Sequence, residues 1–141
     1  MDIRPLTATY SVTPQITPDD VAAIKAAGFG TVICNRPDPE IPADLHAEAM
    51  RAEVEAAGLA FVVNPVVPGQ LTMENVETQR AVIDGATAPV LAYCASGNRS
   101  SIVWALANAG RVPTDDLIAA GAKHGYQLAQ FRELIERLAQ G

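Results

Sequence analysis

Short apolar runs alternate with helical patterns along most of the chain. Runs rich in aliphatic and β-branched residues predict strands over Thr31–Cys34, Ala60–Val63 and Pro89–Tyr93. Apolar residues recur at helical spacing between these runs, and a glycine such as Gly28 or Gly58 follows the last of them. Strands that alternate with helices favour a parallel sheet covered on both faces. We therefore expect an α/β fold with about four to five strands flanked by helices.

The other patterns predict the helices and the outer strands. The N-terminal segment Ile3–Val12 is expected to add one or two edge strands, and Asn35–Pro39 is expected to be an irregular loop because prolines recur from position 37 to position 42. Helices are expected from cap residues or apolar stripes over residues 18–27, 45–57, 73–83, 99–108, 114–124 and 128–138.

The composition is that of a folded domain. The chain has 141 residues, of which 49% are hydrophobic and 18% charged, a balance that excludes disorder. We therefore expect residues 1–141 to form a single domain. No apolar run approaches the ~20 residues of a membrane span, and none near the N-terminus resembles a secretory leader. The expected location is the cytoplasm.

The charge balance excludes two classes of partner. Asp and Glu number 16 against 10 Lys and Arg, which gives a net charge of −6. An acidic chain without a basic cluster lacks the footprint of a nucleic-acid or lipid-surface binder, so we expect neither nucleic acid nor membrane as a partner. The two cysteines, Cys34 and Cys94, cannot form a disulfide scaffold. In a reducing compartment each is either a small buried residue or a working thiol.

One junction between a strand and a helix has the composition of a reactive site. Its sequence is Cys94-Ala95-Ser96-Gly97-Asn98-Arg99-Ser100. Ligands of open α/β sheets bind beyond the carboxyl ends of the strands, where Cys94 is expected. The loop amides of Ala95, Ser96, Gly97 and Asn98 can form an anion nest at a helix N-terminus. Arg99 can hold an oxyanion in a bidentate fork, and the Ser100 hydroxyl can donate to the sulfur of Cys94.

The alternative is a buried structural cysteine before an ordinary capped helix. The coincidence of Cys, Gly, Arg and Ser within seven residues favours a working site. A helix N-terminus and a neighbouring arginine favour a thiolate, and the thiolate is the nucleophilic form of cysteine.

Two motifs together resemble a known family. Cys94-x4-Arg99-Ser100 after an apolar strand, with Asn35-Arg36-Pro37-Asp38-x-Glu40 after an earlier strand, resembles the phosphatase-like domain of the beta-lactamase-hydrolase-like proteins. The resemblance covers nearly the whole chain and implies the cysteine-phosphatase fold of dual-specificity phosphatases. It also implies a link to sulfide metabolism, either as a phosphatase-like protein or as a sulfurtransferase. A persulfide-dioxygenase-type metallo-hydrolase is the protein partner that it suggests.

The loop length and the lack of an acid favour sulfur transfer. The Cys94–Arg99 loop is one residue shorter than the Cys-x5-Arg loop of cysteine phosphatases and equals that of rhodanese-type sulfurtransferases. Phosphatases of this fold take their general acid from a loop that here reads Asn64–Leu71 and has no carboxylate. Asp38, Glu40 or Glu74 would have to replace it. Sulfur transfer needs no such acid, because thiolate and sulfite are good leaving groups.

The sequence therefore predicts a sulfurtransferase that carries sulfane sulfur on Cys94 as a persulfide. A tyrosine or dual-specificity phosphatase acting through a phosphocysteine is the first alternative, and a non-catalytic module that binds an anion or senses a persulfide is the second. The substrates are expected to be a small sulfur donor and acceptor, or else a phosphoester. Ala95 stands where related loops often have Arg, which favours a thiol-bound persulfide over thiosulfate as donor.

The remaining candidates are weighed by their neighbours in the sequence. Arg36 follows a strand end, where it can bind substrate or, slightly more in keeping with its sequence, pair with Asp38 or Glu40. Cys34 is expected to be structural rather than a resolving thiol. No Cys/His spacing indicates a metal site and no glycine-rich nucleotide loop is present, so no cofactor is expected.

Overall fold

The fold is described from a computed structural model of residues 1–141. One five-stranded sheet has the strand order β1-β2-β5-β3-β4. The strands are β1 (Arg4–Pro5), β2 (Tyr10–Thr13), β3 (Thr31–Cys34), β4 (Ala60–Val63) and β5 (Val90–Tyr93). The helices are α1 (Val21–Ala26), α2 (Ala47–Ala56), α3 (Met73–Gly85), α4 (Asn98–Ala107), α5 (Thr114–Ala122) and α6 (Arg132–Gln140). This architecture confirms the predicted α/β class.

The sheet is parallel except at one edge. β2, β5, β3 and β4 pair in parallel, and β1 pairs antiparallel with β2. The prediction of edge strands in Ile3–Val12 is correct for β1 and wrong for β2, because Tyr10–Thr13 also pairs with β5 and so lies inside the sheet. The pattern of apolar residues alone does not show whether a strand lies at the edge of a sheet or is paired on both sides.

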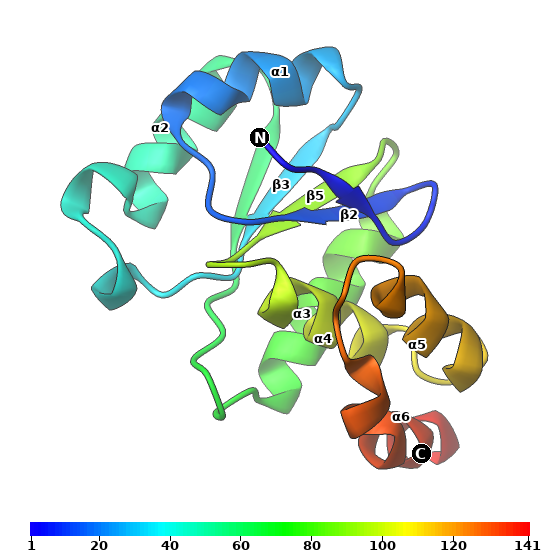
Figure 1. The fold of residues 1–141 in the computed structure, drawn as a ribbon. Coiled ribbons are helices and arrows are strands. Elements are labelled where there is room, and N and C mark those ends of the chain that lie inside the picture. The colour runs from blue at the N-terminus through cyan, green and yellow to red at the C-terminus, as the bar shows by residue number, and fades with distance from the viewer.

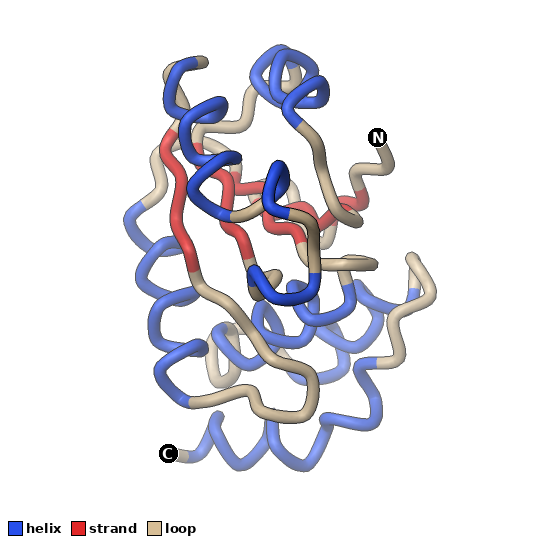
Figure 2. Tube along the Cα trace, turned by 90° about the vertical axis from the view of Figure 1, so that its left-hand side faces the viewer, coloured by secondary structure: helices blue, strands red, loops and turns tan.

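Helices cover both faces of the sheet. α1 and α2 lie over one face, and α3 and α4 lie over the other with α5 and α6 outside them (Figures 1 and 2). β5 shows how alternation divides the core. Leu91 and Tyr93 belong to the cluster under α1 and α2, while Val90 and Ala92 belong to the cluster under α3 to α6. Trp104 is in this second cluster and stacks on Tyr10 with ring centroids 6.0 Å apart.

Both edges of the sheet are partly blocked. β1 has only two residues, and its second, Pro5, has no backbone N–H to offer to another strand. At the other edge the Arg51 guanidinium of α2 lies 5.4 Å from the Phe61 ring centroid and donates to the Phe61 carbonyl of β4.

The proline-rich segment after β3 is more regular than predicted. Residues Asp38–Glu40 and Ala43–Leu45 form single 3₁₀ turns. A proline stands within or just before each turn, where its fixed φ and missing N–H favour the start of a helical turn. The Asp38 carboxylate then accepts from the Ala47 amide at 2.8 Å and fixes the start of α2.

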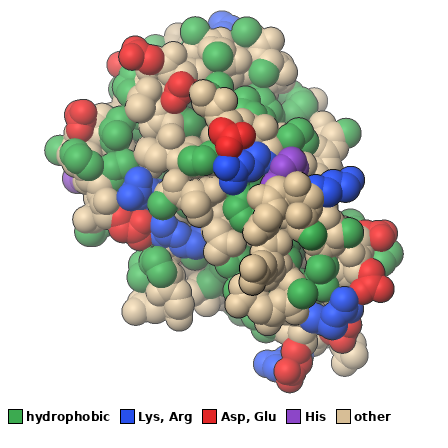
Figure 3. Space-filling model, viewed as in Figure 1, with side chains coloured by type: hydrophobic (Ala, Val, Ile, Leu, Met, Phe, Trp, Pro, Cys, Tyr) green, Lys and Arg blue, Asp and Glu red, His purple; other side chains and the backbone are tan.

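None of the helices combines the length and apolar character needed to cross a membrane. On the face seen in Figure 3, basic and acidic side chains lie next to one another at several places.

Candidate active site

The candidate site lies where the carboxyl ends of β3, β4 and β5 meet. Asn35, Asn64 and Cys94 directly follow these three strands. Cys94 is 1% exposed, so its sulfur is buried in the protein. The chain then turns into α4, which begins at Asn98 and confirms the predicted strand-loop-helix junction.

A left-handed glycine closes the loop around the sulfur. Gly97 has φ +91° and its N–H donates to Cys94 Sγ at 3.1 Å. The Tyr126 hydroxyl packs against Gly97 so closely that a Cβ at this position would overlap it. The same hydroxyl donates to the Ser96 carbonyl at 2.8 Å and accepts from Arg4 Nη1 at 2.8 Å. Segments far apart in sequence thus hold the loop in place.

Backbone donors gather around this loop. The N–H groups of Ala95, Ser96, Arg99 and Ser100 have no acceptor within the chain, and that of Asn98 donates to Ser96 Oγ. Asn98, Arg99 and Ser100 form the first turn of α4, where the helix dipole is positive. Unpaired amides at a helix N-terminus are the usual ligands of a bound anion. Of the four amides predicted to form an anion nest, those of Ala95 and Ser96 are unpaired, whereas those of Gly97 and Asn98 donate within the loop.

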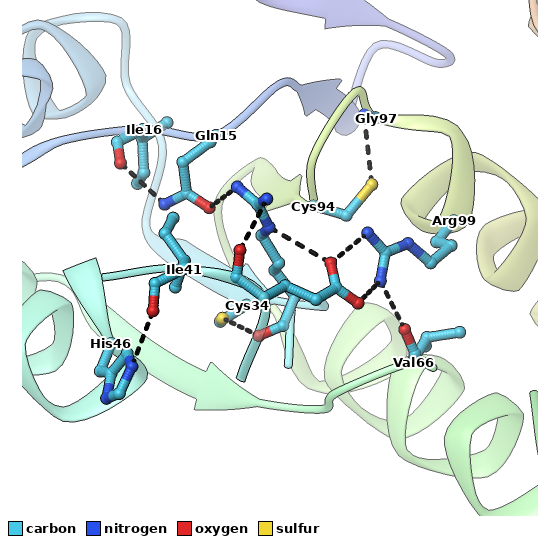
Figure 4. Close-up of polar contacts among 11 residues, drawn as sticks. Gln15, Ile16, Cys34, Ile41, His46, Val66, Cys94, Gly97 and Arg99 are labelled. Carbon is cyan, nitrogen blue, oxygen red and sulfur yellow. Dashed lines mark hydrogen bonds and ion pairs between the residues drawn. The ribbon is translucent and has the colours of Figure 1, made fainter. Parts of the chain in front are cut away.

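Arg99 is bound by a carboxylate. Its Nη1 and Nη2 donate to the two carboxylate oxygens of Glu40, each at 2.8 Å, and Nη1 also donates to the Val66 carbonyl (Figure 4). The Arg99 guanidinium holds the pKa of Glu40 below its usual range. The fork predicted to hold an external anion thus holds Glu40 in this structure.

Arg36 contacts the same carboxylate from the other side. Its Nε donates to Glu40 Oε1 at 3.3 Å, its Nη2 to the Glu40 carbonyl, and its Nη1 to Gln15 Oε1. The prediction that Arg36 forms a salt bridge is confirmed for Glu40. Arg36 and Arg99 are therefore linked through one carboxylate that both contact.

The Ser100 hydroxyl is not where the sequence prediction placed it. It donates to Asn35 Oδ1 at 2.9 Å instead of to the sulfur of Cys94. Ser100 is buried on the first turn of α4, and Asn35, at the end of the neighbouring strand, is buried as well. A buried amide oxygen needs donors, and Ser100 supplies one of the two that Asn35 Oδ1 has.

Asn35 belongs to a buried amide cluster beneath the site. Gln79 of α3 accepts from Asn35 at 3.1 Å and from Asn64 at 2.8 Å, and it donates to Asn35 and to the Tyr10 hydroxyl. Tyr10 in turn donates to the Ser100 carbonyl at 3.0 Å. The cluster fixes the ends of β3 and β4 and the start of α4 relative to one another. No sequence motif marks Gln79, because its partners come from separate elements.

Replacing Gln79 by Leu is expected to lower the free energy of unfolding by roughly 1–3 kcal/mol. The variant keeps the volume but removes every hydrogen bond of the amide, while Asn35, Asn64 and Tyr10 each keep at least one other partner. Urea denaturation measures the change. The exposed Gln130 has no side-chain hydrogen bond, so Gln130→Leu is the control and should change stability by less than about 0.5 kcal/mol. Equal losses in both variants would contradict this role of the cluster.

Cys34 lies apart from these contacts. It is 2% exposed, its Sγ donates to the Arg36 carbonyl at 3.4 Å, and burial raises the pKa of its thiol. These features agree with the structural role predicted for Cys34. No group of three or more His, Cys, Asp or Glu side chains is placed to hold a metal ion.

Several residues of the site escape sequence reasoning. The sequence marks Glu40 as a possible acid and as a possible partner of Arg36, whereas its pairing with Arg99 is shown only by the structure. Tyr126, Arg4 and Gln15 are absent from the predicted site, since nothing near them in the chain indicates a contact with the Cys94 loop. Glu74 and Asp38, the other possible acids, form no hydrogen bond with that loop.

Comparison with known families decides the relationship. Residues 2–111 match the family described as the phosphatase-like domain of beta-lactamase hydrolase-like proteins. The chain belongs to this family. A beta-lactamase hydrolase-like protein of Xylella fastidiosa is 28% identical over 141 residues, which are 99% of this chain and 33% of the relative. The chain thus spans about a third of the length of the curated relatives that it matches.

Solved structures agree on the fold. A proposed phosphatase from Neisseria meningitidis is 34% identical with a TM-score of 0.83, and the match covers 98% of this chain and 99% of that one. Tk-PTP is 18% identical with a TM-score of 0.77 over 98% of this chain and 96% of its own. The phosphatase-like domain described here therefore has the cysteine-phosphatase fold that its sequence predicts.

Proposed function

We propose that this phosphatase-like domain is a sulfurtransferase in which Cys94 carries sulfane sulfur as a persulfide. Glu40 supports this most directly, because no other carboxylate forms a hydrogen bond or ion pair with the Cys94–Arg99 segment. The Arg99 guanidinium lowers the pKa of Glu40, so the carboxylate is ionised at neutral pH and has no proton to give. Hydrolysis of a phosphate ester gains roughly 10²–10⁴-fold from such a proton donor, whereas a thiolate leaves without one.

The proposed reaction has two displacements at sulfur. The Cys94 thiolate attacks the terminal sulfur of a donor R–S–SH, the donor S–S bond breaks, and R–S⁻ leaves with the bonding electron pair. The product Cys94–S–SH then meets an acceptor thiolate, which attacks the outer sulfur. A new persulfide forms on the acceptor, and Cys94 returns to the thiolate with atoms and charge conserved.

Each neighbour has a proposed role in this cycle. The Gly97 N–H, which already donates to Sγ, and the unpaired amides of Ala95, Ser96 and Arg99 stabilise negative charge on the sulfur. The Arg99 side chain is available to an anionic group of the donor through exchange with Glu40. Ser100 acts through Asn35 as a positioning residue rather than through the sulfur.

A phosphatase acting through a phosphocysteine is the second candidate. The family description and the Neisseria meningitidis protein favour it, since both carry a phosphatase name. It predicts hydrolysis of an aryl phosphate with a low-pH limb that reports a general acid. A non-catalytic module that binds an anion or a persulfide predicts no turnover with any donor.

Mass spectrometry of the intact and digested protein tests the proposal. After exposure to a low-molecular-weight persulfide, we expect a gain of about 32 Da, one sulfur atom, on the peptide that contains Cys94. The gain should disappear when a thiol acceptor is added. The peptide with Cys34 serves as internal control and should stay unmodified. Aryl phosphate hydrolysis without any adduct would instead establish the phosphatase.

The acceptor is proposed on the same chemistry. A low-molecular-weight thiol would carry the sulfur onward, and a persulfide-dioxygenase-type metallo-hydrolase is the proposed protein partner that would oxidise it. The cytoplasm supplies the thiol pool that this cycle needs.

A further inference from the structure

We propose that Glu40 is a specificity-determining residue that disfavours dianionic sulfur donors and leaves the site to persulfides of lower charge. The inference rests on the proposed function, and it concerns which donor the site accepts. It starts from the occupied fork of Arg99 and from the charges that surround Cys94.

Glu40 occupies the donors that a dianion would need. Both terminal nitrogens of Arg99 donate to the Glu40 carboxylate at 2.8 Å (Figure 4). This is the bidentate geometry in which Arg99 would otherwise bind an incoming oxyanion. Nη1 also donates to the Val66 carbonyl. The Arg99 side chain is 13% exposed, so water replaces these contacts poorly. A dianionic donor must therefore displace Glu40 or bind without the fork.

The carboxylate is held firmly on its own side. Arg36 donates to Glu40 through Nε to the side chain and through Nη2 to the carbonyl. Glu40 ends a 3₁₀ turn whose first residue, Asp38, is fixed to the Ala47 amide. Pro37 and Pro39 restrict the backbone on either side of Asp38. Moving Glu40 away from Arg99 would thus disturb several contacts rather than only one ion pair.

The charges around the sulfur then balance without a second anion. Arg36 and Arg99 bring two positive charges, and Glu40 cancels one of them. The thiolate that the proposed function requires at Cys94 would cancel the other. Thiosulfate would add two negative charges to a neutral cluster, whereas an alkyl persulfide adds one or none. Because these side chains are only 13% to 26% exposed, the surplus charge is screened less than at an open surface.

Ala95 also disfavours a dianionic donor, independently of Glu40. It follows Cys94 directly and is exposed, so it contributes a methyl group at the mouth of the loop and no further cation. Ser96 and Asn98, which are also exposed, add no charge. Nothing on the loop itself replaces the positive charge that Glu40 neutralises.

Glu40→Gln tests this charge effect with almost no change of shape. The amide oxygen can still accept from Arg99, and the variant removes one negative charge. In the Cys94→Ser background, where no turnover occurs, isothermal titration should show thiosulfate binding about 10-fold more tightly after Glu40→Gln. With Cys94 present, kcat/KM for thiosulfate should rise about 10-fold and that for an uncharged alkyl persulfide should change less than about 2-fold.

The control is Glu48→Gln, which removes an exposed charge on α2 that pairs only with Arg51. It should leave both donors unaffected. Equal losses with both donors in Glu40→Gln would mean that Glu40 only positions Arg99 and would overturn the proposal, as would unchanged thiosulfate binding. Tighter thiosulfate binding without sulfur transfer to any donor would support the role of Glu40 while refuting the proposed function.

Discussion

Cys94→Ser is expected to lower the rate of sulfur transfer by at least roughly 10³-fold, because the nucleophile is lost. A hydroxyl at this position is not ionised at neutral pH, and its oxygen cannot carry a persulfide. The Gly97 N–H and the loop amides remain in the variant, so anion binding should persist. The steady-state rate of sulfur transfer from a persulfide to a thiol measures the loss. Direct detection of the product persulfide, without a dye, avoids background from the free donor.

Cys34→Ala is the matched control for this variant. It removes the other thiol, which is buried, has its pKa raised by that burial, and donates to the Arg36 carbonyl. We expect transfer within about 3-fold of the wild type, with a loss of stability of about 1 kcal/mol for the small cavity. Full activity in Cys94→Ser, or loss of activity in Cys34→Ala alone, would show that the wrong cysteine has been assigned.

Gly97→Ala is expected to reduce the free energy of unfolding by about 2–5 kcal/mol and to abolish anion binding at the loop. Two costs add. Gly97 has φ +91°, a conformation that L side chains rarely adopt, and its added Cβ would overlap Tyr126 Oη and lie 3.1 Å from Cζ. Tyr126 is 6% exposed and cannot swing away without losing its bonds to Ser96 and Arg4. Urea denaturation and thiosulfate titration measure the two effects.

Gly28→Ala separates the two costs. Gly28 has φ +94° but nothing lies within 4 Å of its Cβ position, so this variant reports the backbone cost alone, roughly 1–2 kcal/mol. Tyr126→Phe combined with Gly97→Ala should recover part of the remaining loss, because the overlapping oxygen is gone. Equal destabilisation by Gly97→Ala and Gly28→Ala would refute the proposed contact with Tyr126.

The sequence predicts the fold well where the signal is local. Thr31–Cys34 and Ala60–Val63 form strands with the predicted ends, because β-branched runs bounded by glycine and polar residues admit few other structures. Thr72 caps α3 through the Asn75 amide, as its position suggests. The place of β2 inside the sheet depends on pairing with a strand about eighty residues later, which no local pattern contains.

The features of the site also divide into those that the local sequence predicts and those that it does not. The Cys94 loop is predictable because its glycine, its arginine and its strand end are neighbours in the chain. The partner of Arg99 is not, since Glu40 lies 59 positions away and reaches it only after β3 and β5 pair. The prediction for the Ser100 hydroxyl is wrong for a related reason. Its acceptor Asn35 is 65 positions away, and a short-range prediction assigned the hydroxyl to the nearest sulfur.

The blocked sheet edges have a consequence for how this chain meets other chains. An open edge strand recruits further strands, in aggregation as well as in recognition of extended peptides. Here Pro5 withholds a donor at one edge, and Arg51 already binds the Phe61 carbonyl at the other. Polymerisation through the sheet is thereby disfavoured without any charged run on the strands themselves. A protein-bound thiol would then approach side-chain surfaces at the Cys94 loop and not extend the sheet.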